Sequence, residues 1–197
     1  MKLTIEQGKF LVRFARRVIE EHFNGKRLEI PENMRDIMEK EKGVFVTLYL
    51  YPSHNLRGCM GYTEGIMPLA NALKDVALSS AFKDLRFRPV RKNELNRITI
   101  EVSILTDPEL IRVNDPSEYP GKIEIGRDGL IVENLSKGVI LPQVAVEQRW
   151  NVREFLSKTC MKAGFDPDCW IKDPIKVYKF SAQIFSEVEP GGEVVEK

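Results

Sequence analysis

A thiol and a guanidinium stand close together in the segment NLRGCMGY (55–62). Arg57 and Cys59 are two positions apart, so on a regular strand their side chains share one face, where the positive charge would favour a thiolate. Gly58 and Gly61 leave room for a substrate or another backbone to come close. The segment is therefore a candidate site with Cys59 as nucleophile. The alternative is a packed strand in which the cysteine is a small hydrophobe.

A catalytic thiol also needs a base. The chain has two histidines, His22 at the end of the first expected helix and His54 in the turn before the segment. His54 is therefore the candidate base, with Glu64 as a second proton carrier. A metal site built from His54, Cys59 and Glu64 is less favoured, because His-x4-Cys is not a recurrent ligand spacing and no second cluster completes it. We expect neither a metal nor a cofactor.

A second candidate region is the basic stretch from Lys83 to Arg97. Its six basic residues against two acidic ones give a local excess of +4, which could bind phosphates or an acidic partner. The alternative, which we favour, is a solvated loop and short helix in which Asp84 pairs with Arg86 or caps the turn. A third candidate is Gln143, which with Glu147 would lie on one face of a helix opened by Pro142.

The composition bears on several classes of function. A net charge of +1 means that no overall electric field draws in nucleic acid or membrane. The most apolar run, VFVTLYLY (44–51), is too short to span a bilayer. No GxxxxGKS/T, GxGxxG, HExxH or GxSxG motif is present. Three cysteines without a CxxC pair argue against a disulfide framework and for a reducing cytoplasm, with Cys160 and Cys169 as packing residues.

The first half of the chain alternates between helical and strand patterns. Thr4 and Gln7 form a capping box that opens a helix, and Asn24-Gly25 closes it. A short helix follows Pro31, and residues 68–81 form another. Residues 44–51 and the segment after the turn at 51–55 form a hairpin. Arg97–Leu105 alternates, with Thr99, Glu101 and Ser103 expected to face outward.

The second half contains shorter elements between turns rich in Asp and Pro. Three strands are expected at 122–126, 130–134 and 138–142, then helices from Gln143 and over 151–163. Strand alternation returns at 178–184, and the acidic tail EVEPGGEVVEK is expected to be disordered. These elements predict an α+β fold with two unequal subdomains, each an antiparallel sheet with flanking helices, separated by a cleft. The larger subdomain would be 1–107 plus 174–197, and the smaller, inserted one 108–173.

Several stretches in the same order resemble the AMMECR family, which is named for a human chromosomal region linked to Alport syndrome, midface hypoplasia and elliptocytosis. They are LRGCMG (56–61), DLRFRPV (84–90), IEVSIL (100–105), GLIV (129–132), LPQV (141–144) and the segment from Trp150 to Gly164. The resemblance covers nearly the whole chain and is of the archaeal or bacterial stand-alone type. It implies a single two-subdomain α+β domain in which LRGCMG lines the interface between the lobes.

The resemblance does not imply one activity. Some family members are fused to, or encoded beside, Memo-type proteins and radical-SAM enzymes, which suggests a shared modification pathway. We expect a cytoplasmic protein that binds a protein or peptide in the cleft, with ligand-binding residues Leu56, Arg57, Gly58, Cys59, Met60, Gly61, Arg86 and Gln143. The first alternative is an enzyme using Cys59 and Arg57. The second is nucleic-acid binding through 83–97.

Overall fold

A computed structural model describes residues 2–25 and 28–197. The chain divides into two compact units, each described here by itself: Met1–Leu105 with Gln183–Lys197 form the first unit, and Thr106–Ala182 the second. The expected smaller lobe, 108–173, lies within the second unit. One strand, β7 (Lys176–Glu187), contributes its beginning to the second unit and its end to the first.

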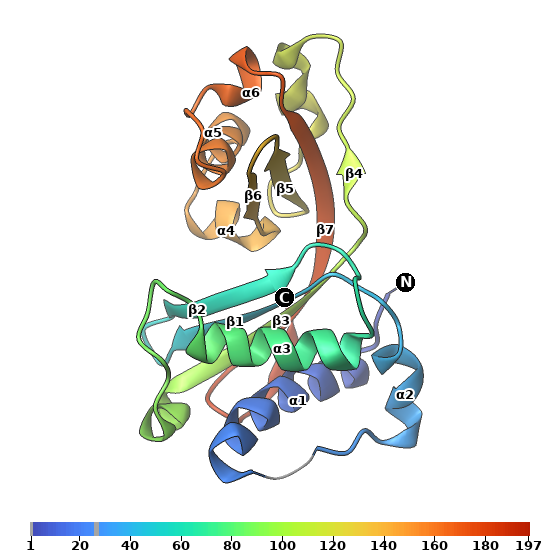
Figure 1. Ribbon diagram of the computed structural model, residues 1–197, viewed down its shortest axis with the longest axis vertical. Helices are drawn as coiled ribbons and strands as arrows, with labels where there is room; N and C mark the ends of the chain where they lie inside the picture. Colours follow the sequence, from blue (N-terminus) through green and yellow to red (C-terminus); the bar gives the residue numbers. More distant parts are fainter. Residues whose placement is uncertain (1, 26–27) are drawn as a thin grey trace. The chain divides into compact units, whose positions relative to one another are not determined.

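The first unit is a sheet covered by helices (Figure 1). Its strands follow the order β2-β1-β3-β7, β1 being antiparallel to β2 and to β3. Its elements are α1 (Ile5–Asn24), α2 (Glu32–Met38), β1 (Val44–Leu50), β2 (Asn55–Tyr62), α3 (Leu69–Phe82), the 3₁₀ helix η1 (Lys92–Arg97), β3 (Ile98–Leu105), the end of β7, and β8 (Val194–Glu196). The α+β class and the hairpin expected at 44–62 are confirmed.

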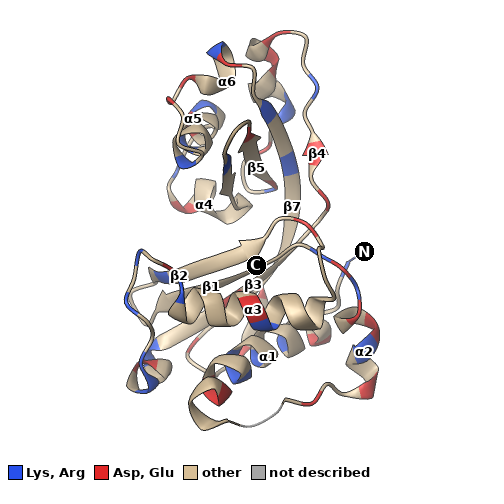
Figure 2. Cartoon of the chain, in the orientation of Figure 1, with Lys and Arg blue, Asp and Glu red and all other residues tan. Residues whose placement is uncertain are grey.

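Local sequence signals explain where these helices begin and end. Thr4 and Gln7 form the expected capping box, and Gly25 closes α1 in a left-handed conformation (φ 75°). The α3 helix packs on β1 and β2, and α1 packs on β3 and against α3. The core between them contains fully buried side chains from both layers, including Leu11, Leu48, Leu73 and Ile100. Figure 2 shows positively and negatively charged residues interspersed along the chain within each unit, in line with the net charge of +1.

The expectation that alternate residues of β3 face outward is wrong. All eight residues of the strand are buried, including Thr99, Glu101 and Ser103. β3 is a central strand, so polar side chains on its second face can be satisfied by neighbouring elements: the Glu101 carboxylate accepts a hydrogen bond from Lys197 Nζ at 2.7 Å. The alternating polar residues of β3 therefore mark a buried face on which Glu101 is hydrogen-bonded, and not a face in contact with water.

The expected disorder of the acidic tail is also wrong. Residues Val194–Glu196 form β8, which pairs antiparallel with Phe185–Glu187 of β7. Val194 is buried in the core of the first unit, while Glu193 and Glu196 are exposed. The tail thus has a strand pattern, with valine in the core and glutamate in water, that a count of its charges conceals.

The second unit is a smaller sheet in the order β4-β7-β5-β6 with short helices. Its elements are β4 (Glu109–Leu110), the 3₁₀ helix η2 (Pro116–Lys122), β5 (Asp128–Glu133), β6 (Lys137–Ile140), α4 (Pro142–Glu147), α5 (Val152–Lys162), α6 (Cys169–Lys172) and the beginning of β7. The strand expected at 122–126 is absent from this described unit. Residues there end η2 and enter a turn in which Gly126 has φ 88°, a conformation that favours glycine and interrupts a ladder.

The cysteines of the second unit correct a further expectation. Cys160, near the end of α5, and Cys169, the first residue of α6, form a disulfide and are both fully buried. The turn between the helices, where Gly164 has φ 83°, returns the chain so that the two Cα atoms lie 5.9 Å apart. An odd cysteine count cannot reveal this contact, and the inference of a reducing cytoplasm loses its support. Within the described part of the chain, no helix has the length and apolarity needed to cross a membrane.

Candidate functional site

The hexapeptide 56–61 lies on β2, which is hydrogen-bonded to β1 alone among the described strands. Cys59 is opposite Thr47, and Gly58 is opposite Leu48. The register shifts between Leu48 and Tyr49, so that Arg57 is the extra residue of a bulge. A bulge re-aims a side chain, and Arg57 therefore does not share the face of Cys59 as a regular strand would require.

The two glycines of the hexapeptide accommodate this protein's own atoms. A Cβ on Gly58 would lie 2.2 Å from the carbonyl oxygen of Ser80 in α3, and one on Gly61 would lie 2.2 Å from the ring of Phe45. Gly58 is thus what allows α3 to pack closely on the sheet. The expectation that the glycines permit another backbone to approach holds at Gly58, where that backbone belongs to α3.

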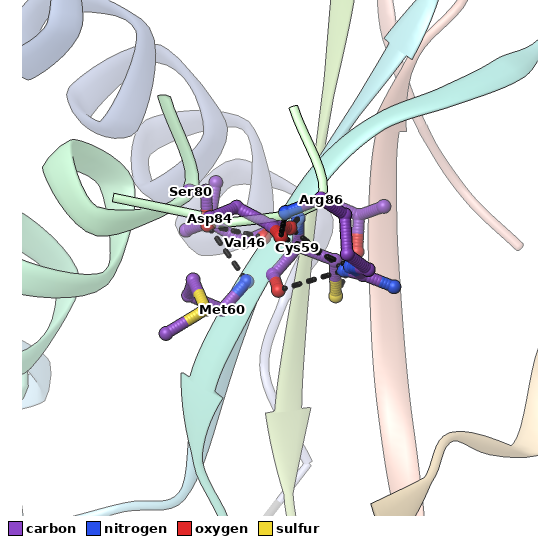
Figure 3. A network of polar contacts seen from close by, with 7 residues as sticks. Val46, Cys59, Met60, Ser80, Asp84 and Arg86 are labelled. Carbon is purple, nitrogen blue, oxygen red and sulfur yellow. Dashed lines mark hydrogen bonds and ion pairs between the residues drawn. The ribbon is translucent and has the colours of Figure 1, made fainter. Parts of the chain in front are cut away.

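The close approach of α3 places a hydroxyl between two strands. Ser80 Oγ donates to the carbonyl of Val46 at 2.8 Å and accepts from the N–H of Met60 at 2.9 Å (Figure 3). The sequence gives no signal that Ser80 has this role, because it is one of several small residues in α3.

The outward-facing backbone of Cys59 is capped by the loop that follows α3. Asp84 Oδ2 accepts from the N–H of Cys59 at 2.9 Å, and Arg86 Nη2 donates to the Cys59 carbonyl at 3.3 Å. Arg86 also donates to both carboxylate oxygens of Asp84, so the pair forms a fork on the strand edge (Figure 3). The expected pairing of Asp84 with Arg86 is present, and it protects an edge that could otherwise recruit another strand.

The surroundings of Asp84 strongly favour the ionised form of its carboxyl group. Burial raises the pKa of its carboxyl, but hydrogen bonds from Arg86 and from the N–H of Cys59 outweigh that and lower the pKa to about 2. A folded-state pKa below the ordinary 3.8 contributes stability above about pH 4 that is lost as pH falls toward 2. By this linkage the contribution is about 2 kcal/mol.

We expect Asp84→Asn to lower the free energy of unfolding by about 1 to 2 kcal/mol at pH 7, since Asn keeps part of the hydrogen bonding and loses the charge. The difference from wild type should shrink as pH falls from 4 toward 2. Urea unfolding at several pH values measures both effects. The control is Asp36→Asn, whose exposed carboxylate pairs only locally with Lys40 and should change stability by less than about 0.5 kcal/mol. A pH-independent loss for Asp84→Asn would contradict the charge argument.

Arg57 is held by internal contacts. Its Nε donates to Glu94 Oε2 at 3.1 Å and its Nη2 to the carbonyl of Arg88 at 2.9 Å, while the guanidinium carbon lies 6.0 Å from the centre of the Phe87 ring. The side chain is mostly buried. Arg57 therefore fastens the 83–97 stretch to β2, and Arg86 is the more exposed arginine of the site.

The thiol of Cys59 lies in a row of polar side chains across three strands. Thr47 is opposite Cys59 on one side and Glu101 on the other, so all three side chains point to the same face. Thr47 Oγ1 donates to Cys59 Sγ at 3.3 Å, and the buried Glu101 pairs with Lys197. Thr47, Glu101 and Lys197 were missed from the sequence. The available signal was a threonine inside the apolar strand VFVTLYL and a charged residue, Glu101, between the two hydroxyl residues of the strand ITIEVSIL.

His54 lies beside this row. Its ring stacks on Tyr49 at 4.1 Å between centroids, and Tyr49 is two residues along β1 from Thr47, on the same face. In the described part of the chain, no group of three or more His, Cys, Asp or Glu side chains could hold a metal ion. Gln143 lies on α4 of the second unit, and its predicted part in the same site stays a prediction.

Comparison with known proteins agrees with this fold. A protein of Methanocaldococcus jannaschii is 53% identical over 196 residues, covering 99% of this chain and 97% of the relative. A protein of Methanococcus aeolicus is 47% identical over 197 residues, covering 100% and 98%. The crystal structure of an uncharacterised protein from Pyrococcus horikoshii superposes with a TM-score of 0.92 at 49% identity, covering 98% of this chain and 97% of the other. A sequence model of the AMMECR1 family matches residues 12–185, and the chain therefore belongs to the AMMECR1 family.

Proposed function

We propose that this protein binds a segment of another protein on a surface at the edge of β2, which we call the docking surface and define as Met60, Leu85 and Arg86. The observation that carries the proposal is the position of Leu85, a residue that is 100% exposed. Met60, on β2, is also exposed. Leu56 is exposed as well, but it is opposite Tyr49 whereas Met60 is opposite Val46, so the two side chains point to opposite faces of the sheet. Large apolar side chains grouped on a surface are typical of sites where a partner binds.

The loop that carries Leu85 is rigidly held. Its neighbour Asp84 is buried and bonded to the backbone of Cys59, and Arg86 contacts the same residue. Because the contacts of its neighbours hold the loop around Leu85, the backbone there loses little conformational freedom when a partner covers it, which favours affinity. The hexapeptide thus supports the docking surface through the backbone of Cys59 and contributes Met60 to it.

The charge around the docking surface favours an acidic partner. Lys83, Arg86, Arg88 and Arg91 are exposed in the loop and around it, and the side chain of Arg86 is 52% exposed although it pairs with Asp84. The partner segment we propose therefore combines apolar anchors for Leu85 and Met60 with carboxylates for these cations. Whether that segment lies in a cleft between the two subdomains stays a prediction.

Leu85→Ala is expected to weaken binding of the partner by about tenfold, because truncating a central apolar anchor costs at least about 1.4 kcal/mol. Partners are first recovered from lysate with wild type, and the affinity of each purified partner segment is then measured by calorimetry. The control is Leu135→Ala, which removes a leucine of equal size that is 97% exposed in the second unit. Equal affinity of the partner for wild type and Leu85→Ala would overturn the proposal. The proposal would also be overturned if nuclease treatment of the lysate abolished the capture, because that result would indicate nucleic-acid binding by the 83–97 stretch.

A second candidate function is an enzyme that uses the Cys59 thiol. The specific observation is the hydrogen bond from Thr47 to Cys59 Sγ, which favours a thiolate. Glu101, in the same row, and His54 are the candidate proton carriers.

Alkylation by iodoacetamide tests the enzyme hypothesis. The reaction reports on Cys59 specifically, because Cys59 is the one cysteine of the described chain outside a disulfide. A reactive thiolate should be alkylated at neutral pH about tenfold faster than a cysteine in an unstructured peptide. Thr47→Val should slow the reaction toward that reference while leaving the fold intact. A wild-type rate at or below the reference would exclude a nucleophilic Cys59.

A further inference from the structure

The second unit contains a groove that none of the above functions uses. Its volume is about 930 Å³, within the range of pockets that hold small molecules. One wall is formed by β4 and the residues after it, and the other by Gly121–Glu124 at the end of η2; Arg127 and Lys179 complete the lining. All of these residues belong to the second unit, so the groove is independent of the docking surface.

Two lysines tie the walls of the groove together. Lys122 Nζ, on one wall, donates to the carbonyl of Arg112 on the other at 2.5 Å. Lys179 Nζ, on β7, donates to the carbonyl of Lys122 at 3.1 Å. These hydrogen bonds fix the separation of the two walls, a preorganisation that lowers the cost of binding.

Some charged side chains of the groove form ion pairs within the unit, and others can bind a ligand. Lys122 pairs with Glu118, and Arg127 pairs with Glu124 and Asp128. The guanidinium of Arg112 is exposed and makes no ion pair with a described carboxylate, and the ammonium of Lys179 has two further N–H donors beyond its bond to Lys122. Two carboxylates also line the groove: Glu124, which pairs with Arg127, and Glu109, which lies across from Lys179 in the β4–β7 pair.

The groove also offers an apolar contact. Leu110, the second residue of β4, lines it with a partly exposed side chain, and the buried Ile111 and Ile123 complete that lining. A ligand that fits combines an anionic group, bound by a planar guanidinium and an ammonium, with a small apolar body. Phosphate matches the donor geometry of arginine and lysine.

We propose that this groove binds a small organic phosphate monoester, with Arg112 and Lys179 on the phosphate and Leu110 against the apolar part. Phenyl phosphate and inorganic phosphate are the probes, titrated into the full-length protein and followed by the NMR shifts of backbone amides. Phenyl phosphate should cause saturable shifts at residues 109–112 and 121–124, and it should bind more tightly than inorganic phosphate.

Three variants make the test specific. Arg112→Ala should weaken phenyl phosphate binding about tenfold, the value of one charge-assisted contact. Glu109→Gln should tighten it about threefold by removing the carboxylate across from Lys179. Arg153→Ala, which removes an exposed arginine of the same unit outside the groove, should leave it unchanged.

Three results would overturn the proposal. The first is the absence of saturable shifts at millimolar phenyl phosphate. The second is equal weakening by Arg112→Ala and Arg153→Ala, which would show diffuse attraction to surface charge. The third is equal affinity for phenyl phosphate and inorganic phosphate, which would exclude an organic phosphate as the preferred ligand. A spectrum for Arg112→Ala that is unchanged away from the groove verifies that the variant is folded.

Discussion

Replacing Gly58 with alanine is expected to lower the free energy of unfolding by about 2 to 4 kcal/mol, because an added methyl group would overlap a backbone atom. The new Cβ would lie 2.2 Å from the carbonyl oxygen of Ser80, and backbone cannot rotate away as a long side chain can. Either α3 or β2 must shift, and that shift would break the contacts of the Ser80 hydroxyl with Val46 and Met60.

The measurement should report on the first unit. Both tryptophans, Trp150 and Trp170, are in the second unit, so urea unfolding is followed by circular dichroism and by hydrogen exchange of the Cys59 and Met60 amides. Gly121→Ala is the control, since nothing lies within 4 Å of its added Cβ, and it should change stability by less than about 0.5 kcal/mol. Equal stability of the two variants would show that α3 can move off β2 at little cost. The hexapeptide glycine would then have to be explained by a ligand.

Removing Glu187 is expected to destabilise the protein by about 3 to 5 kcal/mol, because it leaves a buried arginine charge without its partner. Arg16 Nε lies 2.5 Å from Glu187 Oε1 and its Nη2 lies 2.5 Å from Glu187 Oε2, in a two-pronged pair between α1 and β7. Glu187 Oε2 also accepts from the N–H of Ile100 at 2.9 Å. Glu187→Ala therefore affects a helix and two strands at once.

The same arginine supplies the control for this prediction. Arg16 Nη1 lies 3.7 Å from Glu20 Oε1, whose side chain is 39% exposed, and Glu20→Ala should cost less than about 0.5 kcal/mol. The double variant Arg16→Met/Glu187→Leu should recover much of the loss of Glu187→Ala, since it removes both buried charges. Denaturant unfolding of the four proteins measures the difference. A loss for Glu187→Ala no larger than for Glu20→Ala would show that water reaches the Arg16 guanidinium.

Both predictions concern elements that hold the candidate site in place. Gly58 sets the distance between α3 and β2, and through it the loop that carries Leu85 and the Asp84–Arg86 fork. Glu187 joins α1 to β3, whose residue Glu101 belongs to the polar row beside Cys59. If Gly58→Ala or Glu187→Ala weakens partner binding, the stability of that variant must be measured as well. Leu85→Ala changes an exposed side chain and should weaken binding without lowering stability, so it separates the two effects.

The elements that depend on local signals were predictable. The capping box at Thr4, the left-handed glycine at 25 and the helix after Pro68 follow from interactions within a few residues, and the hairpin at 44–62 follows from strand patterns around a turn. The acidic tail and the segment at 122–126 were mispredicted because their state depends on other parts of the chain. Val194 needs a core to enter, and a strand at 122–126 would need a partner that the turn at Gly126 prevents.

The candidate site shows the same division. The residue types of LRGCMG identify it as a candidate site, and the family of the whole chain is shown by the match over residues 12–185. The partners of its residues were not predictable. The bulge that turns Arg57 toward Glu94 depends on the register of β1 and β2, and the fork on the Cys59 backbone depends on where the loop after α3 returns.

The fold class, most helix boundaries, the central hairpin and the family can be inferred from the amino-acid sequence, because these depend on local chemistry and on the order of motifs. Four features of the site and its surroundings become visible in the folded chain: Gly58 faces a helix backbone, Arg57 is held internally, Glu101 is buried beside Thr47 and Cys59, and Cys160 bonds to Cys169. Each of these depends on a contact between residues distant along the chain or across a turn, and such contacts are set by packing of the whole unit.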